Sequence, residues 1–203
     1  MSELIDCHTH NPDSTDGIIC VSPDFSAFSP GKVYSVGIHP WDTSDSLKMD
    51  FQALERSASH EQVVAIGESG LDRLRGASLD VQTQVFVRHI ELSEFLRKPL
   101  IVHCVRCSAE LLGLRRRLGP VMPWIYHGFS GKPELARQLT RAGILLSFGE
   151  RGNVESFHGV PSECVLLETD NSSVSIDDIC ALYPDGSAGL AAANLRRIFG
   201  GLH

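Results

Sequence analysis

The sequence of 203 residues lacks any apolar run near the ~20 residues that a membrane-spanning helix needs. Its first residues also lack the basic segment followed by an apolar one that marks a secretory leader. Basic residues are in the minority, with 18 Lys and Arg against 25 Asp and Glu and a net charge of −7. This balance disfavours an extended nucleic-acid-binding surface, which is normally basic. We expect a cytoplasmic protein that does not engage a membrane.

Cysteine is scarce as well, with six residues spread along the chain. Only Cys104 and Cys107 lie close together, and a structural zinc site would need a second such pair. The others stand mostly in short apolar segments, as small buried residues do. Low-complexity linkers, internal repeats and shifts of composition are absent too. The sequence predicts reduced, unbridged thiols and a single domain over residues 1–203.

Short apolar runs recur along the chain, and each ends at a polar or glycine-containing turn. Their near-continuous apolar character, without strict alternation, is typical of strands buried on both faces of a parallel sheet. We predict strands at Leu4–Asp6, Ile18–Val21, Val33–Val36, Val63–Ile66, Leu100–Val102, Trp124–Tyr126, Ile144–Phe148 and Val165–Leu167.

Segments with helical periodicity separate the later strands. We predict helices at Leu47–Ser59, Ser78–Arg97, Ala109–Leu118, Pro133–Ala142, Ser175–Leu182 and Leu190–Phe199. Alternating strands and helices indicate an α/β protein, and eight strands indicate a TIM-barrel-like (β/α)8 barrel.

The chain is shorter than the ~250 residues that such barrels usually have. Residues 10–18 and 21–33 show no helical periodicity, so we predict a trimmed barrel with helices missing after strands 1 and 2. The barrel wall beside strands 1 to 3 should then be bare unless the C-terminal helices or a second subunit cover it.

Two histidines stand at the end of the first predicted strand, in the stretch Asp6-Cys7-His8-Thr9-His10. Alternate residues of a strand point to the same face, so the two imidazoles should lie together. Such a pair can form half of a metal site. Two polar residues at an exposed strand end would give the same pattern. A metal site is therefore predicted only if the chain supplies further ligands.

Further residues of metal-binding types follow later strands, at the carboxyl ends where barrel active sites gather. They are His39, Glu68, His103, His127 and Asp170. Each of them alone has another explanation, as a hydrogen-bonding or turn-capping residue. A barrel brings all its strand ends to one rim, and histidines and carboxylates gathered there are costly to hold together without metal ions. The sequence therefore predicts a metal centre.

Six motifs, in this order, resemble those of the TatD family of metal-dependent hydrolases. They are D-x-H-x-H at 6–10, G-I-H-P-W at 37–41, A-I-G-E-x-G-L-D at 65–72, L-I-V-H-C at 100–104, H-G-F-S-G at 127–131 and L-L-E-T-D at 166–170. The resemblance runs from Leu4 to about Phe199 and implies a short variant of the family. Characterised members are deoxyribonucleases that remove nucleotides from DNA ends, so the implied reaction is phosphodiester hydrolysis.

The resemblance also implies two divalent metal ions, which could be Zn, Mg, Mn or Ni. The implied ligands are His8, His10 and Asp170 on one ion, His103 and His127 on the other, and Glu68 as the bridge. A bridging carboxylate lets two ions approach to ~4 Å, where they activate a shared water and stabilise the attacking and leaving oxygens. Asp170 would accept the proton of that water, so Asp170 and Glu68 are the expected catalytic residues.

Four further residues are expected to bind substrate, namely His39, Trp41, Arg73 and Arg106. His39 would contact a phosphate or orient its neighbours, and the arginines would bind phosphate oxygens unless they are solvated surface residues. Trp41 would stack on a base or form part of a hydrophobic rim. One departure from the family lies here, because Val105 stands where longer members usually carry an Arg.

Two other functions stay open. An amidohydrolase-like enzyme acting on an amide or lactone would use a similar metal centre, but such two-metal enzymes usually carry a carbamylated Lys where this chain has Glu68. A barrel that had lost catalysis would be expected to lose its ligands, and here all six are present. The expected substrate is a small phosphodiester or a DNA end, and the expected state is a monomer or homodimer.

Overall fold

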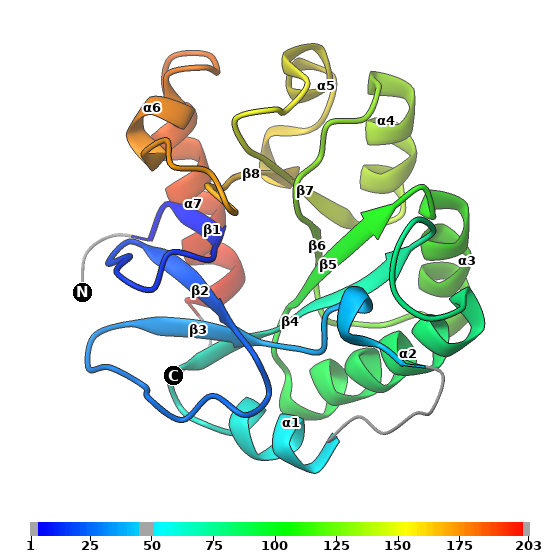
Figure 1. Ribbon diagram of the computed structural model, residues 1–203. Helices are drawn as coiled ribbons and strands as arrows, with labels where there is room; N and C mark the ends of the chain where they lie inside the picture. Colours follow the sequence, from blue (N-terminus) through cyan, green and yellow to red (C-terminus); the bar gives the residue numbers. More distant parts are fainter. Residues whose placement is uncertain (1–3, 45–50, 201–203) are drawn as a thin grey trace. The chain divides into compact units, whose positions relative to one another are not determined.

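The computed structural model describes residues 4–44 and 51–200. Its strands are β1 (Asp6–Thr9), β2 (Gly17–Val21), β3 (Val33–Val36), β4 (Val63–Asp72), β5 (Leu100–Val105), β6 (Trp124–Tyr126), β7 (Ile144–Phe148) and β8 (Val165–Leu167). They form a closed barrel in sequence order, in which β8 pairs in parallel with β1 (Figure 1). The predicted TIM-barrel-like fold is confirmed.

Helices stand between the later strands, as the periodicity predicts (Figure 1). The α-helices are α1 (Phe51–Ala58), α2 (Leu79–Leu96), α3 (Ser108–Leu118), α4 (Pro133–Arg141), α5 (Val154–His158), α6 (Ile176–Cys180) and α7 (Ser187–Phe199), and two 3-10 helices are η1 (Pro40–Asp42) and η2 (Ser162–Cys164). The short helix α5 was not predicted, because five residues are too few to show a period. Residues 47–50 of the first predicted helix lie outside the described residues.

Helix α2 shows how local sequence sets the helix ends. The Ser78 side chain accepts a hydrogen bond from the Val81 amide at the N-terminus, and Arg97 ends the helix in the left-handed conformation at φ 55°. Its buried face includes Val85 and Phe86. In the described ranges, none of the helices combines the length and hydropathy that crossing a membrane would require.

The chain divides into two compact units. The terminal unit comprises residues 1–19 and 125–203, and the central unit comprises residues 20–124. Each unit has its own buried apolar side chains, among them Phe129 and Phe148 in the first and Phe86 and Trp124 in the second. The expectation of a single domain stays a prediction. No disulfide joins the cysteines of the chain, all of which are described.

Residues 10–16 and 22–32, which are fully described, contain no helix, as predicted. In the central unit, the second of these loops packs its own aromatic rings against β3. The rings of Phe25 and Phe28 lie 5.4 and 5.2 Å from that of Tyr34, whose side chain is buried. The barrel wall at β3 is therefore not bare.

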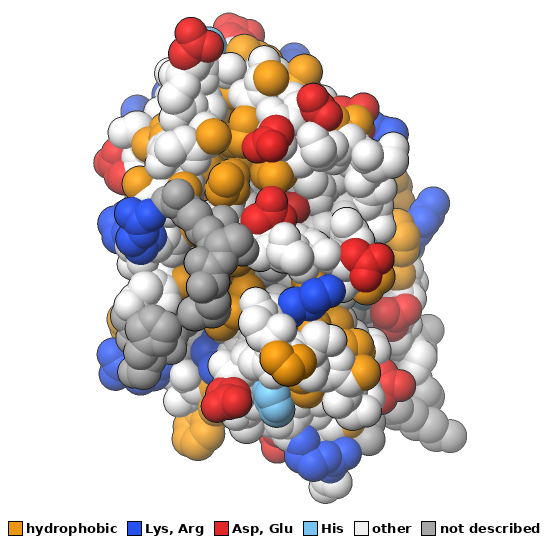
Figure 2. Space-filling view, turned by 90° about the vertical axis from the view of Figure 1, so that its left-hand side faces the viewer, with side chains coloured by type: hydrophobic (Ala, Val, Ile, Leu, Met, Phe, Trp, Pro, Cys, Tyr) orange, Lys and Arg blue, Asp and Glu red, His pale blue; other side chains and the backbone are white. Residues whose placement is uncertain are grey.

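We expected C-terminal helices or a second subunit to cover the barrel wall beside strands 1 to 3. At β3, the loop at residues 22–32 covers it instead. Phe28 also stacks on His60 at 4.0 Å, and Ser57 of α1 donates a hydrogen bond to the Pro23 carbonyl. In the view of Figure 2, hydrophobic side chains on the surface are interrupted by acidic and basic ones.

Strand β4 is longer than the predicted Val63–Ile66, since it continues to Asp72. The prediction stopped early because Gly67 and Gly70 interrupt the apolar run. Both glycines have positive φ, and a Cβ on Gly70 would lie 2.0 Å from the carbonyl oxygen of His103 on β5. Glycine is required here because the backbone of β5 approaches so closely. Glu68 consequently lies within the strand and not after it.

Candidate metal centre

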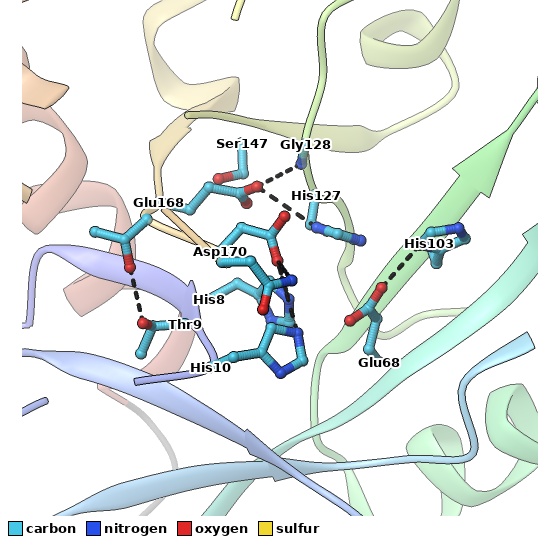
Figure 3. A network of polar contacts seen from close by, with 12 residues as sticks. His8, Thr9, His10, Glu68, His103, His127, Gly128, Ser147, Glu168 and Asp170 are labelled. Atoms are coloured by element: carbon cyan, nitrogen blue, oxygen red, sulfur yellow. Dashed lines mark hydrogen bonds and ion pairs between the residues drawn. The ribbon is translucent and has the colours of Figure 1, made fainter. Parts of the chain in front are cut away.

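In the terminal unit, His8 and His10 lie beside Asp170, which follows β8 (Figure 3). The Nε2 atoms of both histidines are 3.6 Å from Asp170 Oδ1. Backbone pairing fixes this arrangement, because the amide of His10 donates to the Asp170 carbonyl and the amide of Asp170 donates to the His8 carbonyl. The structure thus brings together three of the residues predicted from the sequence. Their ligand atoms lie within 4.8 Å of one another.

The fourth predicted residue of this unit, His127, follows β6 and lies against His8, with ring centroids 4.5 Å apart. Its Nδ1 atom is 3.5 Å from Oε1 of Glu168, a fully buried carboxylate that also accepts a hydrogen bond from the Gly128 amide (Figure 3). Sequence reasoning missed Glu168. Its spacing of two from Asp170 in an extended segment could have placed both carboxylates on one face.

Asp6 joins β1 to the segment after β8. It accepts hydrogen bonds from the amide and hydroxyl of Thr169, at 3.1 and 2.6 Å, and from the amide of His8 at 3.2 Å. Burial raises the pKa of Asp6 to about 6, although these hydrogen bonds oppose the rise. Asp6 therefore supports the strand that carries the histidine pair.

In the central unit, Glu68 of β4 contacts two histidines. Its Oε1 atom lies 2.8 Å from His103 Nδ1 and 2.9 Å from His39 Nε2, and these two nitrogens are 3.3 Å apart. His39 follows β3, as predicted, and caps η1, where its Nδ1 accepts a hydrogen bond from the Trp41 amide. Glu68 is only 4% exposed.

A second buried carboxylate of the central unit, Asp72, was also missed. Its Oδ2 atom lies 3.2 Å from Nε2 of His103, the ring nitrogen that does not face Glu68. Asp72 lies in the motif A-I-G-E-x-G-L-D, beyond the end of the predicted strand Val63–Ile66. Its position at the end of the longer β4 makes it a neighbour of His103, since β4 and β5 pair there.

Two of the predicted substrate-binding residues of the central unit, Arg73 and Trp41, have side-chain partners within the protein. The Arg73 guanidinium pairs with Glu110 and donates a hydrogen bond to the Arg106 carbonyl at 3.1 Å. The Trp41 indole donates a hydrogen bond to Asp72, and the Arg75 guanidinium lies 4.3 Å over its ring. Contact of these residues with a substrate stays a prediction.

A cavity of about 270 Å³ opens in the terminal unit beside Asp170. The loops after β6, β7 and β8 line it, and its polar side chains include Ser130, Arg151 and Asn171. Ser172, also in the lining, donates a hydrogen bond to Glu150 at 2.7 Å. The cavity therefore offers both hydrogen-bond donors and acceptors next to a metal-binding type of carboxylate.

The donor sets of both units suit divalent metal ions. Imidazole nitrogens and carboxylate oxygens are the ligands that zinc, manganese and nickel take from proteins. Three sets, each within one unit, bring their ligand atoms within 4.8 Å of one another: His8, His10 and Asp170; His127, Glu168 and Asp170; and His39, Glu68 and His103.

A family model described as TatD related DNase matches residues 25–173. The chain belongs to this family. Among relatives, it is 31% identical over 145 residues to the uncharacterized metal-dependent hydrolase YabD of Bacillus subtilis. This alignment covers 67% of this chain and 57% of YabD. It is also 31% identical over 152 residues to the 3′-5′ ssDNA/RNA exonuclease TatD of Cronobacter sakazakii, covering 67% of this chain and 56% of that protein.

The chain thus spans somewhat more than half the length of these curated TatD relatives. A crystal structure of YjjV, a TatD homologue from Escherichia coli K12, is similar in fold, with a TM-score of 0.76 over 98% of both chains. At 21% sequence identity this likeness concerns the fold alone.

Proposed function

We propose that this TatD family protein is a hydrolase that cleaves phosphodiester bonds with the help of two divalent metal ions. The observation that carries the proposal is the gathering of imidazoles and carboxylates in both units, at His8, His10 and Asp170 and at Glu68 and His103. The description of the family as DNases, and a relative named as an exonuclease, support a phosphodiester as the substrate.

The proposed ligands are those implied by the motifs: His8, His10 and Asp170 for one ion, His103 and His127 for the other, and Glu68 for both. Bound there, the ions would lower the pKa of a water molecule and stabilise charge on phosphate oxygens. Their identity and their number are part of the proposal. The cytoplasmic location and the monomeric or homodimeric state remain predictions.

Asp170 is proposed as the general base. Its side chain is 37% exposed, so it can reach a water molecule, whereas the neighbouring Glu168 is fully buried and engaged with His127. The cavity beside Asp170 would receive one substituent of the phosphate, with Arg151 close to its charge. A small phosphodiester or the end of a DNA strand would satisfy these conditions.

Metal analysis and a substrate panel test this proposal together. We expect close to two divalent ions per chain, and Mg²⁺-, Mn²⁺- or Zn²⁺-dependent hydrolysis of bis(p-nitrophenyl) phosphate, single-stranded DNA, RNA or dinucleotides. His8→Ala should lose metal and activity, while His158→Ala, at an exposed histidine of α5, should keep both. A protein that takes up no metal would refute the metal centre. Activity on a lactone or amide alone would refute phosphodiester cleavage.

A further inference from the structure

The imidazole of His103 lies between two carboxylates of the central unit. Its Nδ1 is 2.8 Å from Oε1 of Glu68, and its Nε2 is 3.2 Å from Oδ2 of Asp72. We propose that Asp72 is a positioning residue: it holds a proton on Nε2 of His103 and thereby keeps Nδ1 as the metal-binding nitrogen. This inference rests on the proposed function, because it concerns a ligand of the same metal centre.

The carboxylate of Asp72 accepts hydrogen bonds through both of its oxygens. Its Oδ1 accepts a hydrogen bond from the Leu74 amide at 2.7 Å, and its Oδ2 accepts one from the Trp41 indole at 2.5 Å. The Leu74 amide and the Trp41 indole can only donate, so both oxygens of Asp72 act as acceptors. The nitrogen of His103 that faces Oδ2 must therefore carry the proton.

The backbone of Asp72 is held equally firmly. The Gln82 side chain accepts a hydrogen bond from the Asp72 amide at 2.7 Å and donates one to its carbonyl at 2.9 Å. The same Gln82 nitrogen also lies 2.8 Å from the carbonyl oxygens of Arg75 and Ala77, and Gln82 is only 1% exposed. Asp72 therefore has little freedom to turn away from His103.

The other side of the ring shows why the proton position matters. His39 uses Nδ1 as an acceptor from the Trp41 amide, so its own proton lies on Nε2 and is donated to Glu68. If Nε2 of His103 donates to Asp72, the lone pair of Nδ1 faces the Glu68 oxygen at 2.8 Å. Two acceptors at this distance need a proton or a metal cation between them. A histidine that ligates metal through one nitrogen commonly donates the other N–H to a carboxylate.

The test replaces one oxygen of Asp72 by an amide group. In Asp72→Asn, the Leu74 amide should keep the remaining oxygen, so the new NH₂ would face Trp41 and His103. Because an NH₂ group cannot accept, Nε2 of His103 must accept instead, and the proton moves to Nδ1. We expect ¹⁵N NMR to show Nε2 of His103 protonated in the wild-type protein, with and without Zn²⁺, and unprotonated in the variant. Zinc affinity should fall by about 10–100-fold.

Trp41→Phe is the matched control. It removes one donor to Asp72 and keeps the carboxylate, so Nε2 of His103 should stay protonated and zinc affinity should change by less than about threefold. A wild-type spectrum with Nε2 unprotonated would overturn the proposal, as would an Asp72→Asn protein with unchanged proton position and zinc affinity. The wild-type spectrum decides even if the variant does not fold. A wild-type protein that binds no zinc while Nε2 is protonated would refute the metal centre and not the role of Asp72.

Discussion

The side chains of His10 and Asp170 in the terminal unit are 35% and 37% exposed, whereas those of His103 and Glu68 in the central unit are 11% and 4% exposed. Asp170 of the first pair lines the cavity formed by the loops after β6, β7 and β8. The second pair is backed by Asp72, a buried carboxylate fixed by hydrogen bonds. Exposure suits residues that meet water and substrate, and enclosure suits residues that only hold an ion in a fixed geometry.

The largest effects on activity should come from replacing Glu68 in the central unit and Asp170 in the terminal unit. Glu68→Gln and Asp170→Asn should each reduce kcat by about 10³-fold or more, because each removes a proposed metal ligand and Asp170 is also the proposed base. Plasma mass spectrometry should show the greater metal loss for Glu68→Gln, because Glu68 is the more enclosed of the two proposed ligands. Glu155→Gln, at an exposed glutamate of α5, provides the control. Full activity in Glu68→Gln would show that the enclosed carboxylate of the central unit does not hold an ion that the reaction needs.

The enclosure of the central unit also predicts a pH effect on stability. His89 of α2 is fully buried, accepts a hydrogen bond from the Ile38 amide at 2.9 Å and has its Nδ1 2.8 Å from the Val85 carbonyl. Burial lowers its pKa from 6.5 to about 4, although the contact with Val85 opposes the shift. Below pH 6.5 the unfolded chain therefore binds a proton that the native protein does not.

As the pH falls from 7 to 4, this residue should lower the free energy of unfolding by about 3 kcal/mol. Urea unfolding of the wild type and of His89→Gln at both pH values measures the difference, in which the titration of the other histidines cancels. An equal pH dependence in the two proteins would mean that His89 titrates normally, so that the central unit is less enclosed than its contacts indicate.

The smallest effect concerns the cavity of the terminal unit. Arg151→Ala should raise KM by about tenfold with little change in kcat, as expected for the loss of one charge-assisted contact made equally in ground and transition states. Arg141→Ala, at an exposed arginine of α4, should leave both constants unchanged. Steady-state kinetics on a dinucleotide measures both variants. An unchanged KM in Arg151→Ala would show that substrate does not use this cavity.

The sequence predicted the barrel well where apolar runs were uninterrupted. The strands at Val33–Val36 and Ile144–Phe148 match the structure at both ends, because nothing but apolar and small residues fills them. It failed at β4, where Gly67 and Gly70 look like turn residues, although the close approach of β5 requires them in a strand. Asp72 was therefore not predicted as a site residue, because it lies beside His103 only when β4 extends to residue 72.

The sequence also could not predict contacts between side chains that are far apart along the chain. The motifs named the metal-binding residue types, but spacing alone could not show that Arg73 pairs with Glu110 or that the indole of Trp41 is engaged by Asp72. The first contact joins the segments after β4 and β5, and the second joins η1 to the end of β4, so both depend on the folded arrangement of these elements. Glu168 is different, since its alternation with Asp170 was readable from the sequence.

The helix-free connection after β1 has a consequence for folding kinetics. Asp6 pairs with Gly17 across this connection, while Ile66 pairs with Leu100 across one that contains α2. The first loop is about one third as long, so closing it costs about 1 kcal/mol less chain entropy. Short-range pairings of this kind form early in folding. The strand that carries His8 should therefore find its partner β2 before the longer crossovers are in place, and hydrogen exchange during refolding should protect the β1–β2 pairing first.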